Sequence, residues 1–167
     1  MGRDRAELVS IRVGLRSQRL DLLQRDELLK SFPVSTSKYG AGEVRNSHKT
    51  PRGDHVVRAK IGAGLPLGAV FRGRRPTGEI YSAELARVNL DRDWILTRIL
   101  WLSGTQVGKN RLGIVDTMRR YIYIHGTPDS DQLGIPGSIG CIRMANRDIV
   151  ELFDLVAPGT VVHIVEE

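Results

Sequence analysis

Short hydrophobic runs, most of them alternating with polar residues and separated by turn-forming residues, occur along nearly the whole chain. Alternation with a period of two is typical of β-strands that have one buried face. The strands predicted on this basis cover residues 8–15, 19–24, 27–37, 56–61, 94–102, 121–125 and 160–165. The 94–102 strand is the most apolar of these, so we expect it to be buried, with Trp94 and Trp101 in the core.

One segment near the C-terminus has helical periodicity instead. Its apolar residues recur at i, i+3, i+4 and i+7, which predicts a helix that packs one stripe against the sheet, with Asn146 as its N-cap and Pro158-Gly159 as its end. The stripe consists of Ile149, Leu152, Phe153 and Val156. Segments 38–55, 62–78 and 103–120 are rich in polar residues or glycine and predict loops or irregular structure. Many short strands with one helix favour a mostly-β sandwich, formed by residues 1–167 as a single domain.

Composition narrows the possible partners. The chain has 167 residues, of which 41% are hydrophobic and 5% aromatic, so the core should be sizeable and mainly aliphatic. Its 25 basic and 19 acidic residues give a net charge of +6, but the charges are scattered. A basic surface could meet nucleic acid, anionic lipid or small acidic ligands. The absence of long basic runs favours a merely solvated basic surface over a nucleic-acid partner. No apolar stretch is long enough to span a membrane, so we expect no membrane partner.

The first ten residues have mixed charge and no hydrophobic segment of the kind that a secretory signal needs. If Met1 is the natural start, we expect a cytoplasmic protein; if an export signal has been removed, the protein is periplasmic. The single cysteine rules out a disulfide within the chain, so the composition does not require an oxidising compartment.

Cys141 lies in the segment SIGCIRM (138–144) and is the main candidate for chemistry. A thiol attacks only as the thiolate, and a nearby imidazole can take its proton. His125 ends an apolar strand and precedes Gly126, at a strand-to-loop edge of the kind that often holds catalytic groups. Gly140 allows the backbone to approach a substrate closely. We therefore predict a Cys141–His125 dyad, the alternative being that Cys141 is a small buried apolar residue.

Groups around the dyad have expected roles. The amides of Gly140 and Cys141, placed just before the predicted helix, should donate to an oxyanion. The backbone carbonyl of Gly126 or the hydroxyl of Thr127 should orient the imidazole. Tyr121 and Tyr123 are expected to share a strand face with His125, and the two tyrosines either line the groove or pack in the core.

Other polar residues have two readings. Arg74 and Arg75, in the 62–78 loop, could hold a substrate carboxylate, although a solvated loop is favoured. His48 and His55 could belong to a metal site, but the absence of recurring ligand spacing favours solvated loop histidines. His163 in the last predicted strand is expected to be structural. We therefore expect no metal and no organic cofactor.

The segment Ile124-His125-Gly126-Thr127, followed by a loop and then 138–144, resembles the catalytic motif of the YkuD-type L,D-transpeptidases. In that motif a His-Gly-Thr segment precedes Ser-x-Gly-Cys with an Ile-Arg-Met type of tail. Similarity extends from Ile11 to Ile164 and includes the turn at 50–53 and the closing helix. Many members carry histidine at the position of Ile139, and the isoleucine removes a possible side-chain donor.

The resemblance implies an L,D-transpeptidase-like β-sandwich with one short helix after the catalytic cysteine, and one catalytic domain over residues 1–167. It also implies roles within the motif. Arg143 should anchor a substrate carboxylate or serve as a structural salt-bridge partner. Ser138 should shape the turn beside the substrate, and Ile139 and Tyr123 should lie along the substrate groove.

The implied substrate is a peptidoglycan stem tetrapeptide, a muropeptide, cut between the L-centre of its third residue and the terminal D-Ala. We expect water to accept the acyl group, which makes the protein an L,D-carboxypeptidase of peptidoglycan recycling. The first alternative is a periplasmic L,D-transpeptidase that forms 3–3 cross-links or exchanges D-amino acids. The second is a non-catalytic peptidoglycan-binding module, for which Ile139 is the only support.

Overall fold

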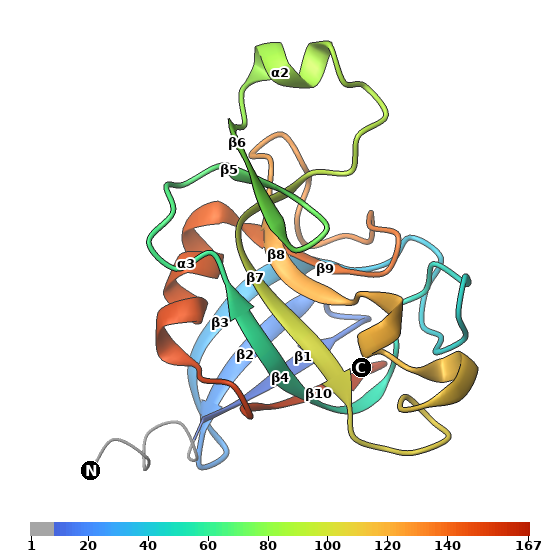
Figure 1. The fold of residues 1–167 in the computed structure, drawn as a ribbon. Coiled ribbons are helices and arrows are strands. Elements are labelled where there is room, and N and C mark those ends of the chain that lie inside the picture. The colour runs from blue at the N-terminus through green and yellow to red at the C-terminus, as the bar shows by residue number, and fades with distance from the viewer. Residues whose placement is uncertain (1–8) are drawn as a thin grey trace.

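The computed structural model describes residues 9–167, and in this range ten strands join into one sheet (Figure 1). The strands are β1 (Val9–Gly14), β2 (Arg19–Gln24), β3 (Glu27–Ser35), β4 (Gly53–Ile61), β5 (Ala69–Arg72), β6 (Arg75–Ile80), β7 (Ile95–Gly104), β8 (Tyr123–Thr127), β9 (Ile142–Ala145) and β10 (Val161–Val165). The helices are α2 (Ala83–Arg87) and α3 (Asn146–Leu155), with short 3₁₀ turns η1 (Gly113–Val115) and η2 (Met118–Arg120). The predictions made for residues 1–8, including the absence of a leader segment, lie outside the described residues.

The sheet closes on itself. Its strand order is β4-β10-β1-β2-β3-β9-β8-β7-β5-β6, and an additional antiparallel pairing of β4 with β7 completes a barrel-like sandwich. Among the paired strands of residues 9–167, two pairs are parallel, β1 with β10 and β8 with β9. The mostly-β sandwich that the hydrophobic pattern predicted is confirmed. No helix within residues 9–167 combines the length and apolar character that a bilayer crossing needs.

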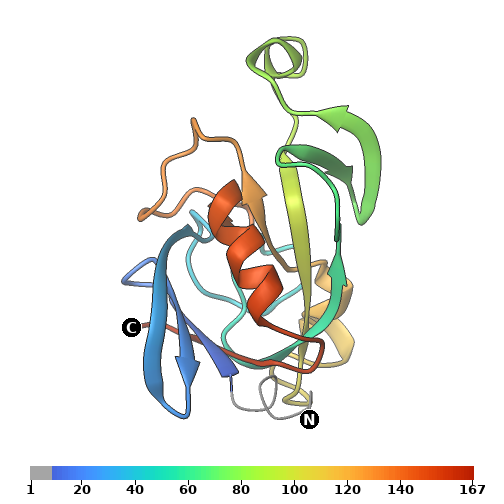
Figure 2. The same cartoon turned by 90° about the vertical axis from the view of Figure 1, so that its left-hand side faces the viewer.

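Helix α3 completes the core. Figure 2 shows it lying between the β1–β3 side of the molecule and the side that carries β4 and β7. The predicted stripe of Ile149, Leu152 and Phe153 is buried and packs with the aliphatic residues of the sheet. Each fully buried side chain of this size contributes roughly 1.5–3 kcal/mol relative to exposure. The helix ends at Leu155, before Pro158, as predicted.

Segment 62–78 was wrongly predicted as a loop. It contains β5 and the start of β6, which form a hairpin whose first strand pairs with β7 through Val70 and Phe71. The glycines and prolines obscured the pattern, and β6 is largely exposed, so it lacks the alternation of a half-buried strand. Helix α2, at the far end of this projecting arm, was also missed (Figure 1). It has no buried residue, so it carries no apolar stripe that periodicity could detect.

The strand β9 lies between the cysteine and the helix, and the sequence reading missed it. The prediction that Asn146 caps α3 is wrong, because Ala145 occupies the N-cap position and Asn146 is the first helical residue. Tyr121 has a left-handed backbone (φ 56°) and lies before β8, so it does not share the strand face of Tyr123. Trp94 and Trp101 are half-buried rather than core residues.

His55 was expected to be a solvated loop residue, but it is fully buried in β4. Its Nδ1 lies 3.0 Å from the carbonyl oxygen of Gly53, and its Nε2 lies 2.9 Å from the hydroxyl of Thr117. Burial lowers the pKa of His55 to about 4, since the imidazolium would lose its hydration. His55 is therefore neutral in the folded protein.

The buried His55 predicts a loss of stability in mild acid. Below its unfolded-state pKa of about 6.5, the unfolded chain binds a proton that the folded chain excludes until about pH 4, so stability falls as the pH drops through this window. Between pH 6.5 and 5 the parent should lose about 1.6 kcal/mol more than His55→Gln, because the slope rises from half of 1.36 kcal/mol per pH unit at pH 6.5 towards that full value at pH 5. Urea unfolding at several pH values measures the difference, and parallel pH dependence of parent and variant would contradict it.

Candidate active site

The parallel pairing of β8 with β9 brings the two halves of the motif together. In its register His125 lies beside Arg143 and Ile124 beside Ile142. Because aligned residues of paired strands point to the same face, continuing the register by one residue places Cys141 level with Tyr123, on the face that carries His125. Pairing with β8 therefore positions a cysteine that lies one residue before β9 itself.

The thiol of Cys141 has two backbone partners. The amide N–H of Tyr123 donates to Sγ at 3.3 Å, and Sγ–H donates to the carbonyl oxygen of Tyr121 at 3.4 Å. The half-buried residue packs against a cluster that contains Phe71, Ile99 and Tyr123. Desolvation raises the pKa of the Cys141 thiol to about 12, although the Tyr123 amide acts in the opposite direction.

The imidazole of His125 is 1% exposed. Its Nδ1 lies 2.7 Å from the carbonyl oxygen of Gly126, which can only accept, so Nδ1 carries the proton and Nε2 offers a lone pair. Desolvation lowers the pKa of His125. Nε2 is buried without a hydrogen-bond partner among the described residues. A buried polar atom without a partner destabilises the fold, and a catalytic role explains why this one is retained.

The dyad therefore rests as a neutral thiol and a neutral imidazole, and the two are not hydrogen-bonded to each other. For Cys141 to react, its S–H must turn from the Tyr121 carbonyl to a base that can take the proton. Nε2 of His125 is a base with a free lone pair on the same face. The carbonyl of Gly126, one of the two orienting groups expected from the sequence, contacts the imidazole. The other, Thr127, donates its hydroxyl to Asp131 instead.

A bulge in β7 lies opposite His125 and Gly126. Leu96 pairs with Gly126 and Ile99 with His125, so Thr97 and Arg98 are extra residues at this point. Thr97 has a φ of 74°, which is unfavourable for a β-branched residue and costs of order 1–3 kcal/mol. Gly126 tolerates this crowding because it lacks a Cβ, which would lie 2.6 Å from the carbonyl oxygen of Leu96.

Asn146 ties the bulge to β8 and α3. Its Oδ1 accepts from the hydroxyl of Thr97 at 2.6 Å, and its Nδ2 donates to the carbonyl oxygen of Thr127 at 3.0 Å. The Thr97 hydroxyl also accepts from the amide of Gly68, at the start of the β5–β6 arm. These contacts hold the His125–Thr127 segment from two sides.

The turn before Cys141 is held by Ser138. Its buried hydroxyl donates to the carbonyl oxygen of Cys141 at 2.6 Å and accepts from the amide of Gly140 at 3.2 Å. The Gly140 amide, expected as an oxyanion donor, is thus occupied here by a side chain. Gly140 has a φ of 133°, a conformation that only glycine adopts without strain. Helix α3 begins at Asn146, beyond β9, so it does not supply the amides beside the thiol.

Two arginines border the thiol with different partners. Arg143 forms ion pairs with Asp93 at 3.0 Å and Asp131 at 3.6 Å. This geometry fits the second role expected for it, that of a structural salt-bridge partner. Arg74, expected in a solvated loop, is half-buried and donates to the hydroxyl of Tyr123 at 3.0 Å. Its guanidinium also lies over the rings of Trp101 and Tyr121, so the β5–β6 hairpin folds back onto the site.

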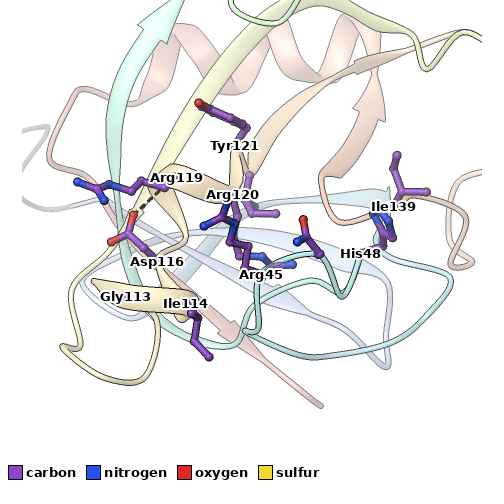
Figure 3. Close-up of a pocket in the computed structure, with 11 residues that line it drawn as sticks. Arg45, His48, Gly113, Ile114, Asp116, Arg119, Arg120, Tyr121 and Ile139 are labelled. Carbon is purple, nitrogen blue, oxygen red and sulfur yellow. Dashed lines mark hydrogen bonds between the residues drawn. The ribbon is translucent and has the colours of Figure 1, made fainter.

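A pocket that Tyr121 helps to line lies next to the site (Figure 3). Ile139 is 46% exposed and lines it, together with His48 and three arginines that the sequence analysis did not single out. These are Arg45, Arg119 and Arg120. The one feature of the sequence that could have indicated this pocket is the pair of adjacent arginines, Arg119 and Arg120, shortly before β8. No metal-ligand cluster is found among residues 9–167, and His48 and His55 lie in different environments.

Comparison with known proteins identifies the class. The family model of the YkuD L,D-transpeptidase catalytic domain matches residues 9–164, so the chain belongs to this family. A Bacillus licheniformis protein named as an L,D-transpeptidase, YkuD, is 30% identical over 155 residues, which are 92% of this chain and 64% of that protein. The chain thus spans a little under two thirds of its relative's length.

Solved structures share the fold at lower identity. An L,D-transpeptidase from Mycobacterium smegmatis has a TM-score of 0.57 and 19% identity, covering 95% of this chain and 58% of that one. An L,D-transpeptidase from Xylanimonas cellulosilytica has a TM-score of 0.60 and 17% identity, covering 94% and 60% respectively. The fold and the family assigned from the motif are both confirmed.

The environment of Cys141 predicts slow and strongly pH-dependent alkylation. With a pKa of about 12, the thiolate fraction and the iodoacetamide rate should rise about tenfold per pH unit from pH 7 to 9, without levelling off. Mass spectrometry follows the reaction at this single cysteine, with N-acetylcysteine as a control that levels off near its own pKa. A plateau below pH 8 would show instead a thiolate–imidazolium pair.

The contacts of Asn146 predict that it stabilises the folded site. Asn146→Ala leaves the Thr127 carbonyl and the Thr97 hydroxyl without these partners, so the free energy of unfolding should fall by about 1–3 kcal/mol. The exposed neighbour Arg147→Ala is the matched control and should change it by less than about 0.5 kcal/mol. Equal urea midpoints for the two variants would show that the contacts contribute nothing.

Proposed function

We propose that this protein is a cysteine acyl-transfer enzyme that cleaves peptidoglycan stem tetrapeptides between the L-centre of the third residue and the terminal D-Ala. The observation that carries the proposal is the Cys141–His125 arrangement, in which a thiol and a buried imidazole with a free Nε2 share one face of β8 and β9. Membership of the L,D-transpeptidase catalytic-domain family supports the substrate class.

In the proposed acylation, Nε2 of His125 takes the thiol proton while Sγ of Cys141 attacks the scissile carbonyl carbon. The C–N bond then breaks, Nε2 returns the proton to the leaving amine, and D-Ala departs from a thioester on Cys141. The carbonyl of Gly126 stabilises the Nδ1 proton throughout, because the imidazolium has two N–H donors. An acceptor then attacks the thioester and regenerates the thiol.

We propose water as the acceptor, which makes the protein an L,D-carboxypeptidase that acts in the cytoplasm on recycled stem peptides. The preference for water rests on the proposed location, where free tetrapeptides rather than the assembled wall are available. With an amine as acceptor, the same thioester would give a 3–3 cross-link or an exchanged D-amino acid. Acylation is common to both outcomes.

Mass spectrometry of products tests the proposal. A disaccharide-tetrapeptide incubated with the protein should lose one alanine, with and without excess D-methionine, and Cys141→Ala should lose at least about 1000-fold in rate. A product that contains D-methionine, or a cross-linked dimer, would show that the enzyme is a transpeptidase rather than a hydrolase. No Cys141-dependent product from a folded protein would reject the enzyme and favour a peptidoglycan-binding module.

A further inference from the structure

The arginine pocket beside the dyad has no role in the chemistry described above. It has a volume of about 610 Å³ and is lined by Arg45, Arg119, Arg120, His48, Asp116, Tyr121, Ile122 and Ile139, among others. In Figure 3, His48 and Ile139 lie at one end of the pocket and Asp116 and Arg119 at the other. Three arginines and one carboxylate, that of Asp116, line the cavity, so the charge of its lining is positive on balance.

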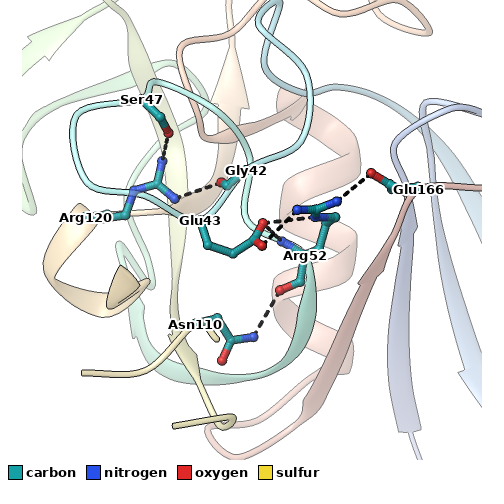
Figure 4. A network of polar contacts seen from close by, with 7 residues as sticks. All are labelled: Gly42, Glu43, Ser47, Arg52, Asn110, Arg120 and Glu166. Carbon is teal, nitrogen blue, oxygen red and sulfur yellow. Dashed lines mark hydrogen bonds and ion pairs between the residues drawn. The ribbon is translucent and has the colours of Figure 1, made fainter. Parts of the chain in front are cut away.

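Arg120 is held by neutral groups only. Its guanidinium donates to the carbonyl oxygen of Gly42 at 3.2 Å and to the hydroxyl of Ser47 at 3.4 Å (Figure 4). It also donates to the carbonyl oxygen of Lys49 at 2.6 Å. Burial lowers the pKa of Arg120, which reflects the cost of holding a desolvated cation. These contacts fix the guanidinium in place without neutralising it.

The nearby carboxylates are already engaged. Glu43 binds Arg52 through both of its oxygens, and it attracts Arg120 only from a distance (Figure 4). Asp116 accepts from the amides of Leu112 at 2.6 Å and Arg119 at 2.9 Å. Consequently, in the part of the chain that the structure describes, no carboxylate forms an ion pair with Arg45, Arg119 or Arg120.

The pocket adjoins the reacting sulfur. Tyr121 lines it, and the Tyr121 carbonyl oxygen accepts a hydrogen bond from the Cys141 thiol. Lys49, which accepts from Arg120, lies against Gly140: a Cβ on that glycine would be 3.6 Å from the Lys49 carbonyl oxygen. The pocket and the thiol thus share Tyr121 as a common border, and Arg120 and Cys141 interact through their charges. The residue that follows a scissile carbonyl at Sγ lies only about 3.8 Å further along the substrate, which is the extension that binding in the pocket requires.

We propose that the pocket formed by Arg45, Arg119 and Arg120 binds the free C-terminal carboxylate of the residue that leaves, so that it selects substrates ending one residue after the scissile bond. The assignment rests on the proposed function. Guanidinium groups match the planar carboxylate and bind it more strongly than neutral donors would. Arg143 is neutralised by Asp93 and Asp131, so it is a poorer anchor than these unpaired arginines.

The test compares a disaccharide-tetrapeptide with its C-terminal amide, which differs only in the charge of the end group. The parent should have a KM about 10- to 100-fold lower for the acid, from one charged hydrogen-bonded contact. The double variant Arg45→Gln/Arg119→Gln changes two exposed side chains and should raise KM for the acid about 10-fold while leaving the amide unchanged. Arg87→Gln, an exposed arginine on α2, is the matched control and should alter neither substrate.

Arg120→Gln should also raise KM for the acid. Because it also removes contacts to 42–49, Arg120→Lys is compared with it: the lysine keeps the charge and should recover part of the preference for the acid. Equal KM values for acid and amide in the parent would overturn the proposal. An equal rise in KM for acid and amide in Arg45→Gln/Arg119→Gln would also overturn it, because the pocket would then recognise another carboxylate of the stem.

Binding to Cys141→Ala separates this proposal from the proposed function. Fluorescence anisotropy with labelled tetrapeptide acid and amide needs no turnover, so it reports on the pocket even if the parent releases no alanine. Tighter binding of the acid that is lost in Arg45→Gln/Arg119→Gln would support the pocket independently of catalysis. Release of alanine by the parent, with acid and amide bound equally, would leave the function intact and overturn the pocket assignment.

Discussion

The parallel pairing of β8 with β9 is the constraint on which the site depends. The two strands carry the histidine and the segment that follows the cysteine, and a one-residue change of register would turn one of the two side chains to the opposite face. The register is held from outside the pair. Met144 pairs with Val34 of β3, Ile99 of β7 pairs with His125, and α3 packs its apolar stripe beneath the strands. Neither strand is a free edge, because β9 pairs with β3 and β8 pairs with β7 on their outer sides.

Strain in β7 is part of the same arrangement. The bulge at Thr97 holds a β-branched residue at positive φ, which persists only because surrounding contacts fix it. Those contacts come from Gly68 and Asn146, and Asn146 also holds the Thr127 carbonyl. Because Gly126 has no Cβ, β7 and β8 approach each other closely at this point. This approach fixes the position of the Gly126 carbonyl, which orients His125. A costly backbone conformation on one strand thus fixes the geometry of a side chain on its neighbour.

Charge is distributed unevenly around the sulfur. Burial favours the neutral forms of both Cys141 and His125, so the resting site avoids a buried ion pair and its desolvation cost. On one side Arg143 is matched by two aspartates. On the other, the half-buried Arg120 donates to backbone carbonyls, and no carboxylate forms an ion pair with it in the described chain. This asymmetry means that an anionic substrate group is attracted to one side of the thiol more than to the other.

The local pattern by itself determined much of this protein. Period-two alternation identified β1, β2 and β10, the helical stripe identified α3, and the Cys141 and His125 motifs identified the family, because each depends on residues close in sequence. Contacts between distant segments decided the rest. The exposed β6 and α2 carry no buried face, β9 is too short to show a period, and the burial of His55 depends on Thr117. The arginine pocket likewise exists only because the chain brings Arg45 beside Arg119 and Arg120, and no spacing along the sequence encodes that meeting.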